Sequence, residues 1–442
     1  MTIDELKRNV DTLVVLIMEN RSFDNVLGHL RHPAEGNRAE VEGIEDLQND
    51  DYVNINSDGL AVRPFWRADA PTASDLPHNA SGVREQLAYD KEADIYLMNG
   101  FVSAFEDQFH SIVTDPPPLG LLRAKDLPTT SPLANQYTVC DNWFSCVPTS
   151  TAPNRLMSMC GATSIAETGT VVPNQPTVYD WLSDHGVRWR VYAAGLPFFT
   201  LMPSVAPLLL TGHFRRLADL DRDVTNESPA DWPQVIFVEP DYYDSPVHFH
   251  PPCDNHAPLA MAPGEAFLAN VYRSLASNSA KWARTVFVVT YDEHGGFFDH
   301  VPPLRVTYRN PNGVSFDSTG PRTPTLVTGP FAPKHGVCKR KLDNTSILQL
   351  IADRFGETGE SYSPEVTGRA QQGIESASAV LDAGAGNTAT CQLGQPVGAD
   401  VASVVINSDL RRGFDTAVRS FVGRHQTEAL TKFPELRRYL GR

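Results

Sequence analysis

The chain has 442 residues, of which 41% are hydrophobic and 20% charged, a composition typical of a folded globular protein. It carries 37 basic and 53 acidic residues, which gives a formal net charge of −16 at pH 7. A chain this acidic repels phosphate backbones, so we expect no nucleic-acid partner. At about 100–200 residues per domain, the length allows one large domain or two to three small ones.

The apolar segments are too short for a membrane protein. The longest runs, such as 285–290, fall far below the roughly 20 residues that cross a bilayer, so we expect no transmembrane segment. Charged residues precede the first apolar run, and no small-residue cleavage site follows it. We therefore expect a cytoplasmic protein as the chain stands, or a secreted one if an export signal was removed. Six scattered cysteines without metal-knuckle spacing favour free thiols over a disulfide framework.

Strand and helix patterns alternate along the chain. Residues 12–18 (TLVVLIM) form a continuous apolar run, which predicts a buried parallel strand. Residues 31–75 are polar and predict a long loop, whereas 83–107 show helical spacing. We expect further strands at 187–194, 235–239, 285–291 and 324–328, and helices at 264–277 and 346–354. This alternation predicts an α/β fold with a mostly parallel sheet covered on both faces.

The C-terminal part differs from the rest in composition. We place a catalytic domain at residues 1–375. Residues 376–407 are rich in Ala, Gly, Thr and Val and predict a flexible crossing. After it, 410–422 and 428–440 predict two amphipathic helices, with Gly423 as a cap between them. We expect this appendage, residues 376–442, to pack on the same domain.

Polar side chains follow two of the predicted core strands. Glu19 and Asn20 follow residue 18, and Asp292 and Glu293 follow residue 291. The carboxyl ends of parallel strands meet at one edge of a sheet, where sites in such folds are found. Carboxylate and amide oxygens are ligands for Ca²⁺, Mg²⁺ or Mn²⁺, and a nearby histidine would favour Zn²⁺. The alternative for Glu19 and Asn20 is an ordinary solvated turn, whereas the two adjacent acids and the histidine at 292–294 are costly at a sharp turn unless a cation compensates them.

The segment STAPNRL, residues 150–156, combines a hydroxyl with a helix start. Pro153 fits the first turn of a helix, which places Thr151 near the N-cap beside free backbone N–H groups. Such an end can bind an anion, although an ordinary threonine cap fits the same pattern. Arg155, one turn later, could clamp a phosphate or pair with an acidic side chain.

Histidines fall in three short clusters, which raises the chance that they line a site. These are His78 in DLPH, then His248, His250 and His256, and finally His294 and His300 in DEHGGFFDH.

Several of these segments, in this order, resemble the motifs of the phosphoesterase family, which contains bacterial phosphatidylcholine-type phospholipases C and related acid phosphatases. The resemblance covers residues 12–357. The segments are MENRSFDN (18–25), STAPNRL (150–156), HPP (250–252), GEAFLANVY (264–272), YDEHGGFFDHVPP (291–303), GPRTP (320–324) and DNTSIL (343–348). The chain departs from the family pattern at Met18, Asn25 and Asn99.

The resemblance implies an alkaline-phosphatase-like three-layer α/β sandwich that uses one or more divalent metal ions. By position, it makes Glu19, Asn20, Asp292 and Glu293 the metal ligands. It makes Thr151 a nucleophile that also contacts the metal and forms a phosphothreonine. His78, His250 and His256 become the candidates for binding phosphate and protonating the leaving group. We also expect Arg155 and His294 to contact the substrate, a small phosphate ester or a phospholipid head group.

Two other interpretations remain open. A hydrolase of sulfate or phosphonate esters could use the same scaffold, but the chain has no C-x-P-x-R sequence, which a sulfatase needs for its nucleophile. A binding protein without catalysis is the second, and it would be favoured if Thr151, Glu19 or Asp292 had been replaced.

Overall fold

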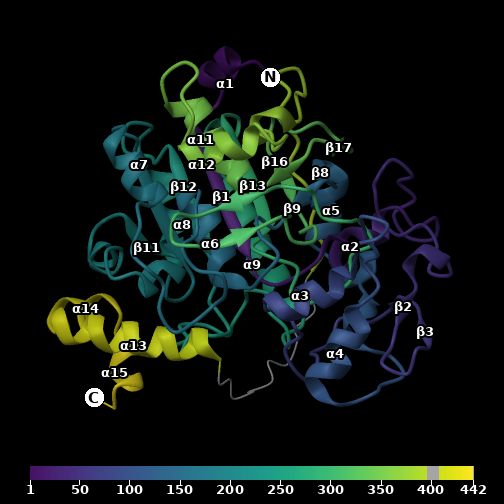
Figure 1. The fold of residues 1–442 in the computed structure, drawn as a ribbon. Helices are drawn as coiled ribbons and strands as arrows, with labels where there is room; N and C mark the ends of the chain where they lie inside the picture. The colour runs from purple at the N-terminus through teal and green to yellow at the C-terminus, as the bar shows by residue number, and fades with distance from the viewer. Residues whose placement is uncertain (396–407, 442) are drawn as a thin grey trace.

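An eight-stranded sheet forms the centre of the structure, a computed structural model that describes residues 1–395 and 408–441 (Figure 1). In spatial order the strands are β11 (Phe214–Arg216), β10 (Trp189–Ala193), β12 (Val235–Glu239), β1 (Thr12–Met18), β13 (Thr285–Tyr291), β16 (Leu326–Thr328), β8 (Thr138–Cys140) and β17 (Gly336–Cys338). Only β16 runs antiparallel to its neighbours. The predicted α/β class with a mostly parallel sheet is confirmed.

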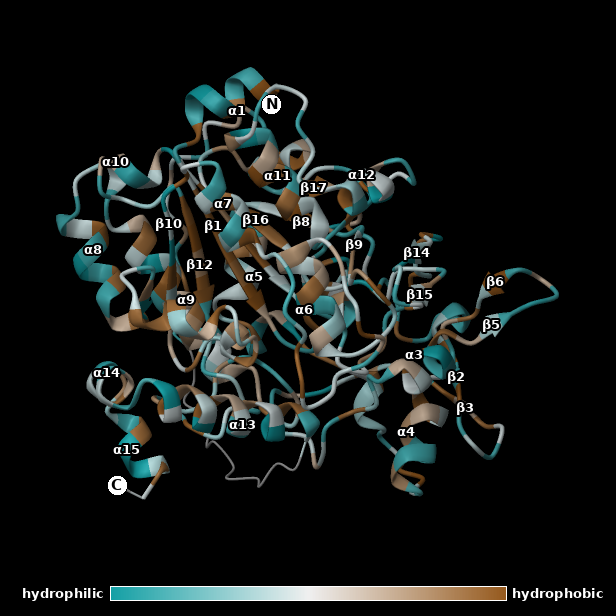
Figure 2. Ribbon diagram, turned by 60° about the vertical axis from the view of Figure 1, so that its left-hand side comes forward, coloured by the Kyte–Doolittle hydropathy of each residue, from teal (hydrophilic) through white to brown (hydrophobic). Residues whose placement is uncertain are grey.

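The apolar runs explain why β1 and β13 lie in the middle. Every residue of both strands is buried. Successive side chains of a strand point to opposite faces, so both faces of the sheet are covered. Figure 2 shows the central strands as the brown, hydrophobic part of the molecule. All the predicted core strands form, some with shorter ends than the sequence indicated.

Two groups of helices pack around the sheet. In the first, α6 (Thr151–Cys160) contacts α11 (Thr345–Phe355), and α11 contacts α1 (Ile3–Asn9) and α12 (Pro364–Ala370). In the second, α9 (Ala262–Ala276) contacts α8 (Leu220–Asn226) and α10 (Ser279–Trp282). A further helix, α7 (Val178–Asp184), packs against β10. The long predicted helices at 264–277 and 346–354 correspond to α9 and α11.

The helical prediction for residues 83–107 is wrong in its middle. Two helices, α3 (Ala80–Leu87) and α4 (Phe101–Phe109), are separated by the hairpin of β5 (Tyr89–Asp90) and β6 (Ile95–Tyr96). Ala88 adopts the left-handed conformation with φ 45° and ends α3. The Asp90 carboxylate then accepts the N–H groups of Glu92 and Ala93, which closes the turn.

The excursion at 31–75 is mostly loop, as expected, with a small hairpin of β2 (Asn54–Ile55) and β3 (Ala61–Val62). A second apolar cluster anchors it to α3 and α4. This cluster contains Ile44, Tyr52, Val83, Leu87, Phe101 and Phe298 among its buried members. Figure 1 shows this lobe beside the sheet, on the side of α3 and α4.

The C-terminal region forms three helices, α13 (Asp409–Arg424), α14 (Gln426–Lys432) and α15 (Glu435–Tyr439). Gly423 lies inside α13 and not at its cap, and the chain turns at His425. The second predicted helix is divided because Pro434 cannot continue α14. Leu410, Phe414 and Phe421 of α13 join the main core.

Residues 396–407 of the predicted crossing lie outside the described residues. Within the rest of it, 377–380 form a short 3₁₀ helix, and a domain boundary at 375 stays a prediction. No helix among residues 1–395 and 408–441 is long and apolar enough to cross a membrane. All six cysteines are free thiols, as expected.

Candidate functional site

The register of β1 and β13 brings the two acidic pairs together. Met18 and Tyr291, the last residues of these strands, are direct partners in the sheet. Glu19 and Asp292 therefore leave the sheet side by side, and both are fully buried. Asn20, at φ 63°, donates its backbone N–H to Asp292 Oδ1 at 3.1 Å. The two pairs thus lie at the same edge of the sheet, and their convergence on one cation stays a prediction.

A glycine lets the two loops touch. Gly295 has φ 63°, and a Cβ at this position would lie 2.1 Å from the carbonyl oxygen of Asn20. Only glycine permits this approach. The backbone N–H of Gly295 also donates to Glu293 Oε2 at 2.7 Å, and the N–H of Arg21 donates to the carbonyl of Glu293 at 3.1 Å. The Gly pair after Glu293 and His294 therefore fixes the position of the Glu293 side chain.

Arg155 joins the two strand ends. Its guanidinium donates to Glu19 Oε1 at 3.3 Å and to Asp292 Oδ2 at 3.2 Å. It also donates to the carbonyls of Ile17 and Met18, at 3.0 and 3.1 Å. Pairing with acidic side chains is thus the contact that the structure gives Arg155, and contact with a substrate stays a prediction. Burial raises the pKa of Asp292 to about 6, although Arg155 opposes the shift.

Two buried oxygens of the predicted ligands have no hydrogen-bond partner within residues 1–395 and 408–441. They are Asn20 Oδ1 and Glu293 Oε1. An unsatisfied buried acceptor is costly unless a donor or a cation compensates it. Amide and carboxylate oxygens are ligands that divalent cations take, and each oxygen of Glu19 and Asp292 can accept more than one contact. The free oxygens of Asn20 and Glu293 therefore suit a divalent ion, and binding of one ion by all four predicted ligands stays a prediction.

His256 connects this point to a cavity. Its Nδ1 lies 3.1 Å from Glu19 Oε2 and 3.4 Å from Asp244 Oδ2, and its Nε2 lies 3.3 Å from Asp75 Oδ1. Burial lowers the pKa of His256, but the charges of Asp75 and Glu19 outweigh it and hold the pKa well above its usual range. These contacts favour the protonated form of His256.

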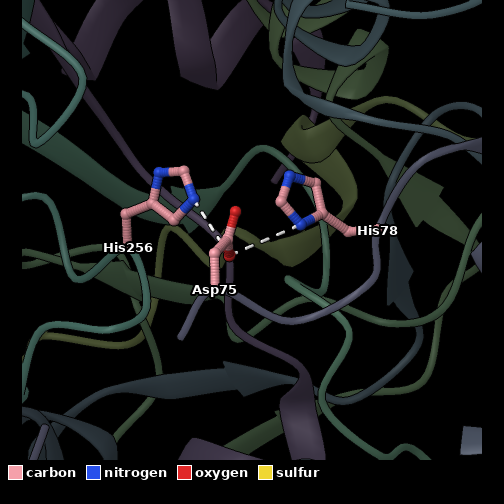
Figure 3. A group of neighbouring side chains, drawn as sticks. All are labelled: Asp75, His78 and His256. Carbon is pink, nitrogen blue, oxygen red and sulfur yellow. Dashed lines mark ion pairs between the residues drawn. The ribbon is translucent and has the colours of Figure 1, made fainter. Parts of the chain in front are cut away.

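His78 lies on the other side of Asp75 (Figure 3). Its Nδ1 donates to the carbonyl of Leu76 at 2.7 Å, so its Nε2 is the atom that faces Asn20 Nδ2 at 3.4 Å. The rings of His78 and His256 are 5.6 Å apart. Two clusters of close carboxylate and imidazole atoms include His256, one with Asp75 and His78 and one with Glu19 and Asp244.

Thr151 opens into the same cavity. It is the first residue of α6, after the N-cap Ser150, whose hydroxyl accepts the N–H of Thr168 at 2.8 Å. A cavity of about 300 Å³ lies at this helix start, where the positive end of the helix favours anions. Its charged and hydroxyl-bearing lining residues are Asp75, His78, Ser150, Thr151, Glu167, Thr168, Asp244, His256, Ser408 and Asp409.

Two predicted residues lie elsewhere. His250 is exposed, because the buried carboxylate of Asp241 accepts its backbone N–H and holds the 248–250 segment outward. The structure therefore does not bring it to Thr151. His294 is buried behind Glu293, where its Nε2 contacts Gln86 Oε1 at 2.7 Å. His294 is not among the residues that line the cavity, so its contact with a substrate stays a prediction.

Sequence reasoning missed Asp75, Asp244 and Ser408. Asp75 lies three residues before His78, and this spacing was the one signal available for it. Asp244 is a single polar residue in a loop and carries no pattern. Ser408 precedes the predicted helix at 410–422 as an N-cap candidate, and that pattern gives no sign of its contact with Asp244.

A second buried charge cluster supports the loop after β13. Arg322 pairs with Asp24 at 3.0 Å and with Asp299 at 2.9 Å, and His300 Nδ1 contacts Asp24 at 2.6 Å. Because Arg322 compensates the charge of both acids, we interpret the cluster as a structural one that holds this loop in place. Burial lowers the pKa of His300, but Asp24 outweighs it and raises the pKa to about 9.

The phosphoesterase family matches residues 10–357, more than half of the chain. The chain belongs to the phosphoesterase family. The resemblance of its motifs to this family is thereby confirmed.

Proteins named as phospholipases C are similar to this phosphoesterase-family chain. Non-specific phospholipase C1 of Arabidopsis thaliana is 31% identical over 345 residues, which is 74% of this chain and 61% of that protein. Phospholipase C A of Mycobacterium tuberculosis (strain ATCC 25618 / H37Rv) is 27% identical over 402 residues, 79% of this chain and 73% of that protein. The chain spans about six tenths of the length of the plant relatives.

Solved structures resemble this phosphoesterase-family chain only weakly. The lipoteichoic acid synthase LtaP from Listeria monocytogenes has a TM-score of 0.38 at 12% identity, covering 96% of this chain and 93% of that one. A protein in the alkaline phosphatase superfamily from Vibrio parahaemolyticus has a TM-score of 0.33 at 12% identity, with 54% and 62% covered. No statement on the reaction follows from these likenesses.

The charged His300 of this phosphoesterase-family chain gives its stability a pH dependence. A histidine with a raised folded-state pKa contributes stability that is complete below its ordinary value of 6.5 and is lost as pH rises through about 9. We therefore expect the free energy of unfolding to fall by about 3 kcal/mol between pH 6.5 and pH 9 as this contribution is lost. In His300→Gln, the free energy of unfolding measured with urea should not show this decrease with pH.

The exposed His335 provides the matched control, since His335→Gln should keep the wild-type pH dependence. Equal slopes for wild type and His300→Gln between pH 6.5 and 9 would show that His300 is not charged in the folded protein.

Proposed function

We propose that the chain hydrolyses phosphate esters in the cavity at the start of α6, with Thr151 as the nucleophile. One observation carries the proposal: Thr151 shares this cavity with His78 and His256, and His78 Nε2 lies 3.4 Å from the amide nitrogen of Asn20. Family membership and the names of the similar phospholipases C support the same reaction class.

Each residue has a distinct task in the proposed reaction. The Thr151 hydroxyl attacks phosphorus, forms a phosphothreonine and displaces the alcohol of the ester. His256 lines the cavity with its Nε2 toward Asp75, and its raised pKa favours the protonated form, so it can donate a proton to the departing alkoxide. His78 is oriented by Leu76 and lies across Asp75, where it can bind a phosphoryl oxygen. Water then hydrolyses the phosphothreonine.

Glu19, Asn20, Asp292 and Glu293, with the Thr151 hydroxyl, would hold a divalent cation. When bound, such an ion lowers the pKa of a hydroxyl and neutralises phosphoryl oxygens. Arg155 keeps Glu19 and Asp292 at their positions. Calcium, magnesium and manganese suit the oxygen ligands, and zinc would suit a site that also used His256.

The proposed substrate is a small phosphate ester or the head group of a phospholipid. The cavity of about 300 Å³ matches the lower end of the size range of small-molecule sites. Phospholipase C activity is the form that the named relatives favour, and acid phosphatase activity stays a prediction.

Thr151→Ala should lower kcat by on the order of 10³-fold, because the covalent step is lost. It should leave the helix start intact, since Ser150 is the N-cap. Thr151→Ser should retain measurable activity. Kinetics with p-nitrophenyl phosphate and p-nitrophenyl phosphorylcholine would measure both effects.

The neighbouring hydroxyl supplies the control, and Ser150→Ala should keep most of the activity. Trapping the enzyme with substrate at low pH and mapping the phosphopeptide would locate the phosphoryl group. Phosphate on Ser150, or near-normal kcat in Thr151→Ala, would contradict the assignment.

Chelation should abolish hydrolysis while the fold stays intact, because a core of this size does not need an ion to form. Activity and circular dichroism would be followed during treatment with EDTA and after return of single cations. Full activity after exhaustive chelation would count against metal dependence, and the cation that restores the highest kcat would identify the natural ion.

A further inference from the structure

A helix outside the part of the chain that matches the family forms one wall of the cavity. The family match ends at residue 357, whereas α13 begins at Asp409. Ser408, Asp409 and Leu410 nevertheless line the cavity together with Thr151 and His256. Figure 1 shows α13 (yellow) running below the sheet, with its first turn directed toward the middle of the molecule.

Ser408 makes two contacts at this point. Its hydroxyl donates to Asp244 Oδ1 and accepts the backbone N–H of Arg411 at 2.9 Å, which caps α13. The Arg411 side chain donates to the carbonyl of Ser245 at 3.1 Å. The first turn of α13 therefore contacts both Asp244 and Ser245. The hydroxyl proton of Ser408 thus points away from its own helix, toward a buried carboxylate.

Asp244 transmits this contact to His256. It is 2% exposed, and its second oxygen lies 3.4 Å from His256 Nδ1, the atom that Glu19 also contacts. Without a donor from Ser408, Asp244 Oδ1 would be a buried acceptor with no partner among the described residues. The carboxylate would then turn toward other donors, and the closest is the shared Nδ1–H of His256.

The next turn of α13 stabilises the other side of the site. Phe414 is fully buried, and its ring lies 6.2 Å from the rings of both Tyr242 and Phe198. The Arg155 guanidinium lies over these same two rings, 5.3 Å from Tyr242 and 5.4 Å from Phe198. One helix therefore supports both the residues behind His256 and those behind Arg155.

We propose that Ser408 is a positioning residue of the active site, which holds Asp244 so that the imidazole of His256 keeps its Nε2 toward the cavity. This inference rests on the proposed function. If Ser408 has this role, α13 contributes to the active site although it lies beyond residue 357, where the family match ends.

The test has to separate this role from helix capping. Glycine is a favoured N-cap residue although it lacks a hydroxyl, so Ser408→Gly removes the donor to Asp244 with little loss of helix stability. Ser408→Ala removes both, and Ser408→Thr keeps both. We expect kcat for p-nitrophenyl phosphate to fall about tenfold in Ser408→Gly and Ser408→Ala with KM nearly unchanged, and to recover in Ser408→Thr.

Ser420→Ala, on the exposed part of α13, is the matched control and should keep the wild-type kcat. Titration calorimetry with inorganic phosphate gives a second readout that does not need turnover, and we expect Ser408→Gly to bind phosphate more weakly than wild type and Ser408→Thr. Wild-type kcat and phosphate affinity in Ser408→Gly would overturn the inference. If wild type hydrolyses neither test ester, the proposed function fails and phosphate affinity alone decides the role of Ser408.

Discussion

Glu19 and Asp292 directly follow the adjacent buried strands β1 and β13, and the carboxylates of both are shielded from water. Burying an isolated carboxylate is expensive, so the protein has to compensate them from within. Arg155 does so through contacts to both carboxylates and to the carbonyls of β1. Replacing Arg155 would leave uncompensated buried charge, and the arrangement around these strand ends depends on it.

Arg155 and Thr151 are four residues apart in α6 and so lie on the same face of the helix. The contacts that hold Arg155 to the strand ends therefore also set where the Thr151 hydroxyl opens into the cavity. The direct pairing of Met18 with Tyr291, and the close approach at Gly295, complete the same arrangement from the side of the sheet. The same set of contacts thus positions Thr151, which is the proposed nucleophile, Arg155 and the candidate metal ligands.

The central strands could be predicted because their apolar runs are long, rich in β-branched residues and buried on both faces. The acidic pairs could be located for the same reason, since each follows such a strand. The break between α3 and α4 could not, because it depends on Ala88 and Asp90, single residues in a segment with helical spacing. His250 was misplaced because its position depends on Asp241, a contact that no local pattern reveals. Asp75, Asp244 and Ser408 enter the site only through tertiary packing.

The most direct test is to locate a cation and a phosphate analogue in crystals grown with Mn²⁺ and orthovanadate. Anomalous scattering should place manganese against Asn20 Oδ1 and Glu293 Oε1, at the carboxyl ends of β1 and β13. Vanadium should lie next to the hydroxyl of Thr151. Manganese at the cluster of Asp24, Asp299 and His300 instead, or vanadate outside the cavity at the start of α6, would contradict the proposed site.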